Sequence, residues 1–243
     1  MQIRAWSKTD VGCIRVHNED SCLTQVNPDI SLGIVCDGMG GANAGEIASK
    51  LAMETFVECV FMVNDCPEER MRYALERANE EVYCYGWEHP DCRGMGTTLV
   101  ATMVIGDEAY ILNVGDSRAY SIRESGIYQL TRDHSLVEEL VRMGQITPEQ
   151  ARVHPRRNII TRALGTERDV EGDLFIHNAV PGELILMCSD GLSNELTDQE
   201  LWDYVTMGDP ETACKRLIDA ALVRGAHDNV TAVLLELRSE AER

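Results

Sequence analysis

Four aspartates stand where an apolar run of the sequence meets a turn. Asp37 follows "LGIVC", Asp116 follows "AYILNVG", Asp190 follows "LILMCS", and Asp228 precedes "VTAVLLEL". Turn chemistry explains a single Asp-Gly pair, because aspartate and glycine are both favoured in turns. The repetition of this pattern predicts instead that the four carboxylates meet in a common cleft at the ends of strands.

The charge of such a cluster indicates a metal site. Carboxylates that converge beside an apolar core repel one another unless a cation neutralises them. Oxygen ligands suit Mg²⁺ or Mn²⁺, whereas zinc prefers histidine and cysteine ligands at close spacing. The six histidines show no such spacing, and the sequence contains no EF-hand loop. The pattern therefore predicts Mn²⁺ or Mg²⁺, with Ca²⁺ as the second candidate.

Glycines surround the first of these acids in "VCDGMGG", residues 35–41. Gly38 would let a backbone carbonyl approach a metal, and Gly40 and Gly41 would let the chain turn into a helix near Gly45. A nucleotide-binding Walker loop ends in Gly-Lys-Ser/Thr, and "GMGGANAGE" contains no lysine. The glycines therefore favour a metal site over a nucleotide cradle.

Short β-branched or alternating runs between turn residues predict the strands that carry these acids. The runs are residues 2–8, 20–26, 31–36, 97–105, 108–114, 118–123, 126–130, 173–179, 183–188 and 229–237. Their short connections favour antiparallel pairing. Apolar residues at helical spacing predict helices from Gly45 to about Val63 and after Pro67. A capping box at Thr197 and an Asp209-Pro210 start predict two more, the last ending at Gly225. This is an α+β fold whose helices cover sheet faces.

Residues 131–168 depart from the strand pattern. They predict a helix over 135–143, a second start at Thr147-Pro148, and irregular chain as far as Gly165. The sequence shows no repeat and no low-complexity linker. We therefore expect residues 1–243 to form a single domain with a flap-like excursion at about 131–168.

Composition excludes several classes of partner. The formal net charge is −19, from 22 Lys and Arg against 41 Asp and Glu, so nucleic acid and anionic membranes would be repelled. The nine cysteines form no CxxC pair, which is typical of reduced thiols in the cytoplasm. "MQIRAWSKTD" has no apolar signal region, and no apolar window reaches the length of a membrane span. We expect a cytoplasmic protein with no membrane span.

Eight motifs in order resemble the PPM, or PP2C-type, metal-dependent serine/threonine protein phosphatases, in particular the bacterial branch. They are "TDVGCIRVHNED" (9–20), "CDGMGG" (36–41), "GMGTT" (94–98), "VGDSRAY" (114–120), "TRDHS" (131–135), "ITRALG" (160–165), "CSDGL" (188–192) and "HDNVT" (227–231). The resemblance implies a four-layer α-β-β-α sandwich with two antiparallel sheets and a two-metal site at one end.

The resemblance also implies roles for individual residues. Asp37 would bridge two metals, with the Gly38 carbonyl, Asp190 and Asp228 as further ligands. Asp116 and Asp190 would bind a third, weaker metal. Glu19 and Asp20 would hold metal-bound waters, and Arg15 would bind the phosphate.

The implied reaction is hydrolysis of phosphoserine and phosphothreonine in proteins, by a metal-bridged water that attacks phosphorus in line. Two positions depart from the family: Met39 and Ala42 stand where members carry histidine. The general acid therefore stays open between a metal-bound water and His134, although the place of His134 in the "DHS" turn favours a structural role. A serine/threonine kinase is an implied partner, and we expect a monomer.

The excursion carries arginines that could attract an anionic substrate to an acidic protein. "ARVHPRRNIITRALGT" contains Arg152, Arg156, Arg157 and Arg162 and no acid. We expect Arg156 and Arg157 to dock phosphopeptides and Arg162 to be structural; a solvated face or pairing with surface acids is the simpler alternative. Two other functions stay open, a non-catalytic pseudophosphatase and a small-molecule phosphatase with the same two-metal centre.

Overall fold

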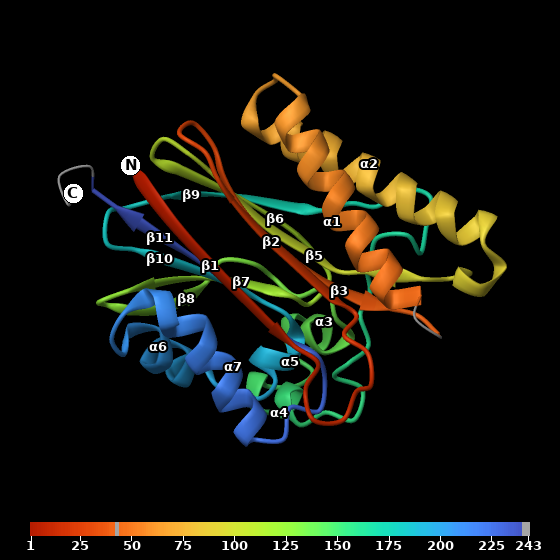
Figure 1. Cartoon of the computed structure of the whole chain (residues 1–243). Coiled ribbons are helices and arrows are strands. Elements are labelled where there is room, and N and C mark those ends of the chain that lie inside the picture. The colour runs from red at the N-terminus through yellow and green to blue at the C-terminus, as the bar shows by residue number, and fades with distance from the viewer. Residues whose placement is uncertain (42–43, 240–243) are drawn as a thin grey trace.

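Two antiparallel sheets lie face to face in the computed structural model, which describes residues 1–41 and 44–239 (Figure 1). The first sheet has the order β1, β11, β10, β7, β8 (Gln2–Asp10, Val230–Arg238, Leu184–Cys188, Arg118–Arg123, Gly126–Gln129). The second has the order β2, β3, β5, β6, β9 (Asp20–Val26, Ser31–Met39, Leu99–Ile105, Glu108–Val114, Asp173–Asn178), and β4 (Gly96–Thr97) pairs with β3.

Helices cover the outer face of each sheet. Helices α1 (Ala44–Met62) and α2 (Pro67–Glu88) share one apolar cluster with the second sheet. Helices α6 (Asp198–Thr206) and α7 (Ala213–Val223) share another with the first sheet. A third cluster fills the space between the sheets. The predicted α+β class and the four-layer α-β-β-α sandwich are thus confirmed.

Alternation along β3 shows how one strand serves two of these layers. Leu32, Ile34 and Cys36 belong to the cluster under α1 and α2, whereas Val35 belongs to the cluster between the sheets. Gly33 faces the same way as Val35, and a Cβ there would lie 2.6 Å from the Met187 Cε atom of the facing sheet. Glycine at this position therefore lets the two sheets pack closely. Continued alternation turns Asp37 to the inter-sheet side.

Most predicted strands have bounds close to those observed, and β2, β6 and β7 have the predicted ones. The main difference lies in β3, which continues to Met39, because Gly38 and Met39 pair with Thr97 and Gly96 of β4. The prediction that Asp37 lies after the strand, in the turn, was therefore wrong.

The helical predictions were mostly right, with one correction. Asp209 caps a 3₁₀ turn, Pro210–Thr212, by accepting a hydrogen bond from the Glu211 amide at 3.0 Å, so α7 begins only at Ala213. Short helix α5 (Asp190–Ser193) and the 3₁₀ turn Pro90–Cys92 were not predicted. Residues 131–168 contain α3 (Leu136–Arg142) and α4 (Pro148–Arg152), both near the predicted starts. In the described ranges no helix combines the length and apolarity that crossing a membrane requires.

A fully buried carboxylate links the two sheets at the end of β10 away from Asp190. Glu183 accepts hydrogen bonds from Ser121 and Arg123 of β7, from His177 of β9 at 2.7 Å, and from the Val180 amide at 3.1 Å. Burial alone would raise the pKa of Glu183, but hydrogen bonds, first that from His177, lower it to about 2. The charged carboxylate is therefore the form that the fold stabilises.

We expect Glu183→Ala to lower the free energy of unfolding by about 3–5 kcal/mol, because it leaves the Arg123 and His177 groups without their buried partner. The carboxylate stabilises the fold above its unfolded pKa of about 4.3, and this contribution is lost as the pH falls toward 2. Urea unfolding at neutral and acidic pH checks both points. The exposed Glu124→Ala is the matched control, and equal stability of the two variants would contradict the prediction.

Candidate metal centre

A groove of about 230 Å³ opens where the ends of the two sheets meet. It is lined by Arg15, Glu19, Asp37, Gly38, Met39, Gly40, Thr98, Asp116, Asn158, Ile160, Asp190 and Asp228. Every predicted ligand except Asp20 is in this lining, together with the predicted phosphate-binding arginine. The structure thus brings together acids from β3, from the β6–β7 turn, from α5 and from the turn just before β11.

Asp20 lies directly beside this groove, opposite Asp37 in the register of β2 and β3. Its Oδ2 atom accepts hydrogen bonds from Ser189 Oγ at 2.7 Å and Thr231 Oγ1 at 2.6 Å, both from the facing sheet. Its Oδ1 atom is buried and has no hydrogen-bond partner among the described residues. A buried oxygen without a hydrogen-bond partner is a plausible ligand for an ordered water or a cation.

The acids strongly perturb one another. Burial and then the neighbouring carboxylates raise the pKa of Asp20 to about 7 and that of Asp190 to about 6. The same causes raise the pKa of Asp37 and of Asp116 well above the usual range. Such a cluster is stable as carboxylates only when positive charge compensates it.

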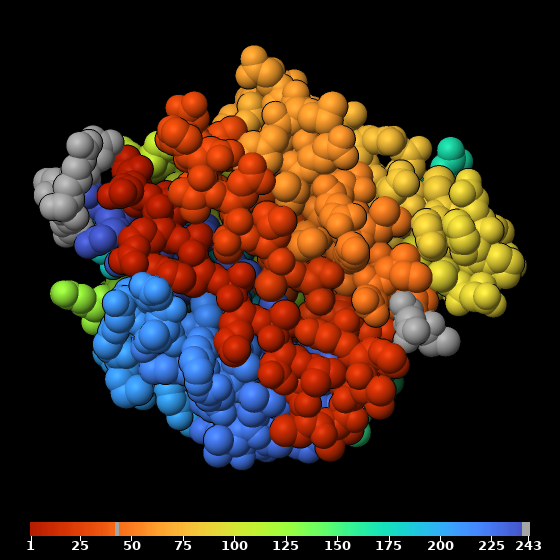
Figure 2. Space-filling view, in the orientation of Figure 1, coloured from red at the N-terminus to blue at the C-terminus, as the bar shows by residue number. Residues whose placement is uncertain are grey.

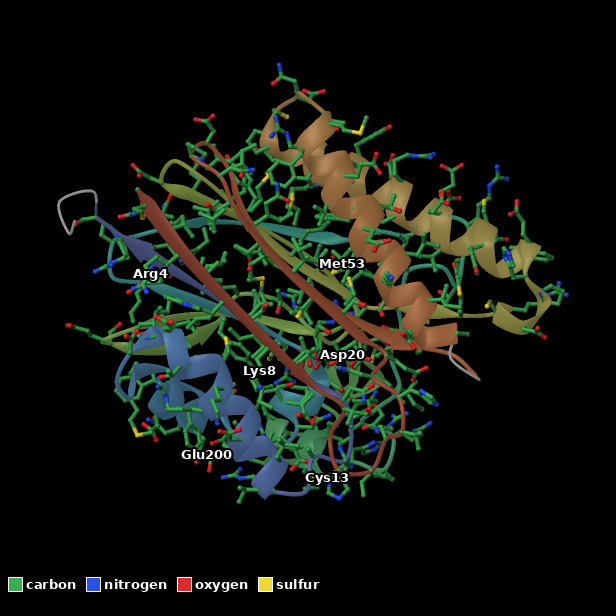
Figure 3. The ribbon with its side chains drawn as sticks, in the orientation of Figure 1. Arg4, Lys8, Cys13, Asp20, Met53 and Glu200 are labelled. Carbon is green, nitrogen blue, oxygen red and sulfur yellow. The ribbon has the colours of Figure 1, made fainter. Side chains whose placement is uncertain are left out.

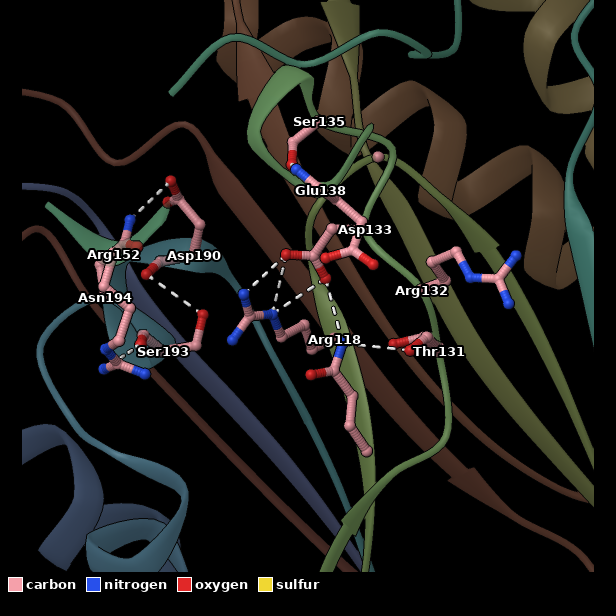
Figure 4. A network of polar contacts seen from close by, with 12 residues as sticks. Arg118, Thr131, Arg132, Asp133, Ser135, Glu138, Arg152, Asp190, Ser193 and Asn194 are labelled. Carbon is pink, nitrogen blue, oxygen red and sulfur yellow. Dashed lines mark hydrogen bonds and ion pairs between the residues drawn. The ribbon is translucent and has the colours of Figure 1, made fainter. Parts of the chain in front are cut away.

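Arg15 supplies part of that charge. Its Nη2 atom donates to Asp228 Oδ2 at 2.8 Å, and its side chain is 47% exposed. Arg118, which borders the neighbouring cavity, is already engaged: its Nε and Nη2 atoms contact Asp133 at 2.9 and 2.6 Å (Figure 4). A single arginine in the groove does not balance its acids, so the donor set fits hard divalent cations.

Among the residues that the structure describes, no three His, Cys, Asp or Glu side chains form a ready-made metal site. The predicted set adds a backbone carbonyl and water to its carboxylates. Its fit to a metal rests on the unpartnered oxygen of Asp20 and on the crowded, buried acids.

Two threonines that sequence reasoning did not single out hold the backbone of Asp37. The Asp37 amide donates to Thr98 Oγ1 at 3.0 Å, and its carbonyl accepts from Thr97 Oγ1 at 2.9 Å. Thr98 Oγ1 also hydrogen-bonds Ser117 Oγ at 2.7 Å, next to Asp116. The motif "GMGTT" was the signal that could have revealed this role.

Gly38 is required by a close approach of three backbone segments. A Cβ there would lie 2.1 Å from the Gly45 carbonyl oxygen and 2.5 Å from that of Glu19. The Gly38 amide donates to the same Glu19 carbonyl at 3.1 Å. Glycine therefore lets β3, the start of α1 and the β1–β2 loop meet at the groove. That the Gly38 carbonyl binds a metal stays a prediction.

Asn229 fixes the loop of residues 11–19, which carries Arg15 and Glu19. Its Nδ2 atom donates to the carbonyls of Val11 and His17, each at 2.9 Å, and its Oδ1 atom accepts from the Glu19 amide at 2.8 Å. Burial raises the pKa of Glu19 as well. The motif "HDNVT" indicates Asp228 as a ligand but does not by itself reveal this role of Asn229.

The structure favours a structural role for His134. Its Nδ1 atom accepts from the Gly115 amide at 3.1 Å, and its Nε2 atom lies 3.3 Å from Asp173 Oδ2. The residue is buried and is absent from the groove lining, and burial lowers its pKa. Met39, in contrast, does line the groove. Ala42, the other departure, lies outside the described residues.

The structure places the excursion's arginines in different surroundings. Arg157 borders a second cavity of about 400 Å³, which also touches Asp116 and Asp190. Arg156 is exposed and lines neither cavity within the described ranges. Arg152 donates to the Ser193 and Leu196 carbonyls at 3.4 and 3.3 Å, so it fastens α4 to α5. Arg162 pairs with Asp173 at 3.2 Å, in line with its expected structural role.

Several known proteins are similar to this chain. A family model described as protein phosphatase 2C matches residues 15–222. The serine/threonine phosphatase Stp of Listeria welshimeri is 38% identical over 236 residues, which cover 94% of each chain. The structure of Stp1 from Staphylococcus aureus matches with a TM-score of 0.91 at 38% identity, covering 98% of this chain and 96% of that one. The catalytic domain of PstP, in complex with two manganese ions, matches with a TM-score of 0.88 at 33% identity, covering 98% and 99%.

We expect Mn²⁺ to raise the Tm more at about pH 7.5 than at about pH 5. The raised pKa values of Asp20 and Asp190 mean that the metal-free fold keeps protons which the unfolded chain releases above about pH 4. The stability of the metal-free fold therefore falls as the pH rises toward 7. Above that pH a bound cation would compensate the charge of the deprotonated acids. Thermal unfolding with and without Mn²⁺ at both pH values checks this.

Asp37→Asn should reduce this Mn²⁺-dependent shift, and the exposed Asp107→Asn should not change it. An equal shift at both pH values would show that the cation does not compete with protons for these acids.

Proposed function

We propose, from the premise that this chain belongs to the protein phosphatase 2C family, that it hydrolyses phosphoserine and phosphothreonine esters in proteins. The observation that carries this proposal is the groove, where Arg15 lies among acids from both sheets. The similar proteins named Stp, Stp1 and PstP are serine/threonine phosphatases, which supports the same substrate class here.

The proposed centre holds two divalent cations, Mn²⁺ or Mg²⁺. Asp37, the Gly38 carbonyl, Asp190 and Asp228 are the proposed ligands, Glu19 and Asp20 act through water, and Asp116 with Asp190 holds a weaker third ion. The all-oxygen donor set and the two manganese ions of PstP support this assignment. Two bound cations would lower the pKa of a water and neutralise the charge of the phosphate.

Arg15 is the proposed phosphate-binding group. Its planar guanidinium can bind two phosphate oxygens, and its half-exposed position leaves an edge free of Asp228. Asp20 is held by Ser189 and Thr231 through one oxygen, and we propose that its other, unpartnered oxygen would accept a hydrogen bond from a metal-bound water. Among the residues that the structure describes, no histidine lines the groove. We therefore propose that water protonates the leaving alkoxide.

The decisive experiment measures hydrolysis of p-nitrophenyl phosphate and of a phosphothreonine peptide. We expect activity with Mn²⁺, none with EDTA, and a loss of more than about a hundredfold in Asp37→Asn, because even outer-shell metal partners contribute about 10–100-fold. Asp107→Asn, an exposed acid on the β5–β6 turn, should keep full activity.

Other outcomes distinguish the alternatives. A folded protein that binds the phosphopeptide with any divalent metal but never turns it over would be a pseudophosphatase. Faster hydrolysis of sugar phosphates than of phosphopeptides would identify a small-molecule phosphatase. A trapped phosphoenzyme would contradict direct attack by water.

We propose that Arg156 and Arg157 help to dock the phosphopeptide beside the groove. Arg157 borders the cavity shared with Asp116 and Asp190, and both arginines are exposed. Replacing both with alanine should lower the ratio of phosphopeptide kcat/KM to p-nitrophenyl phosphate kcat/KM by about three- to tenfold, the size of two exposed ion pairs. Arg168→Ala, another exposed arginine of the excursion, is the control, and an unchanged ratio in the double variant would refute docking.

The remaining proposals concern the protein as a whole. We propose that residues 1–243 work as one domain and as a monomer in the cytoplasm, with a serine/threonine kinase as the counterpart enzyme. Its net charge of −19 argues against a nucleic-acid partner.

A further inference from the structure

We infer that Ile14 and Val16, on either side of Arg15, form a specificity surface for phosphoproteins with apolar residues next to the phosphorylated one. This inference rests on the proposed function, because it needs a phosphate at Arg15. It adds a feature of the substrate that neither the metal centre nor the arginines of the excursion define.

Both side chains are largely exposed. Ile14 is 65% exposed and Val16 is 84% exposed. Single exposed apolar residues are common on protein surfaces and need no explanation. Here two branched aliphatic residues flank Arg15, which lines the groove and pairs with Asp228, so the backbone that carries them borders the groove.

The loop is fixed on both sides of these residues. The Cys13 amide donates to the Ala226 carbonyl at 2.9 Å, and Asn229 holds the carbonyls of Val11 and His17. Figure 3 shows Asp20 within the molecule and Cys13 far out on the loop. Figure 2 shows the N-terminal part of the chain, in red, at the surface beside the blue C-terminal helices. Hydrogen bonds thus hold the loop on both sides of residues 14–16, and these residues remain exposed.

The groove itself is also partly apolar. Asn158 and Ile160 line it from the excursion, and Ile159 between them is 45% exposed. A peptide whose phosphate binds at Arg15 would therefore have aliphatic residues of both the loop and the excursion available for contact. Apolar neighbours of the phosphorylated residue would remove water from these surfaces, which is favourable.

The net charge of the protein also disfavours peptides with acidic residues next to the phosphorylated one. With a net charge of −19, the protein as a whole repels acidic peptides. An apolar flank avoids this repulsion and contacts Ile14 and Val16 directly. A basic flank would also be attracted, but that attraction would not depend on the two aliphatic side chains.

The test uses three phosphothreonine peptides that differ only in the residues on each side of the phosphothreonine: leucine, lysine or aspartate. We expect the wild-type protein to prefer the leucine peptide to the aspartate peptide by at least about tenfold in kcat/KM, the scale of a small apolar contact. Ile14→Ser/Val16→Ser should lower this leucine-to-aspartate ratio by about tenfold. Ile14→Leu/Val16→Leu should retain it.

The matched control is Val26→Ser. Val26 is 45% exposed at the opposite end of β2 from Asp20, so its replacement should leave the ratio unchanged. Because the readout is a ratio within each variant, a general loss of activity through a shifted Arg15 cancels.

The outcomes separate the two levels of inference. A wild-type protein that does not hydrolyse p-nitrophenyl phosphate with Mn²⁺ would refute the proposed function itself. An active protein whose leucine-to-aspartate ratio is the same in the serine double variant would overturn the specificity surface. A preference for lysine that all variants share would show that charge alone selects the substrate.

Discussion

Repulsion among carboxylates constrains the whole molecule, because five aspartates and Glu19 meet at one end of the sandwich. Asp20, Asp37, Asp116, Asp190 and Asp228 lie in or beside one groove. Burial and mutual repulsion raise the pKa of at least four of them. Groups held in this way destabilise the fold until protons or cations compensate them, so packing elsewhere must hold the sheets in place.

The sandwich meets this demand by joining its sheets at both ends. At the groove, Ser189 and Thr231 of the first sheet hold Asp20 of the second. At the far end, Glu183 joins β7 and β9. The apolar cluster between the sheets lies between these two polar links. Because side chains alternate along a strand, a slip of β3 by one residue would turn Asp37 away from the groove.

The sequence was most informative where the relevant interactions are local. Alternation predicted β2, β6 and β7 with their observed bounds, and the Thr197 capping box predicted α6. It failed for the end of β3, because pairing with β4 depends on residues about sixty positions later in the chain. The roles of Asn229 and Thr98 escaped notice for the same reason, since their partners are distant in sequence. The acids themselves were found because their residue type and position carried the chemistry.

One side chain, that of Asn229, positions both the proposed reaction centre and the proposed specificity surface. Asn229 follows Asp228, and its side-chain amide also fixes the loop that carries Arg15, Ile14 and Val16. The proposed metal ligand, the proposed phosphate-binding group and the proposed specificity surface are therefore positioned by one buried amide. A change in the flanking side chains can alter which peptide is preferred without moving that anchor. This arrangement would allow a constant reaction centre to acquire different substrate preferences through exposed residues of a single loop.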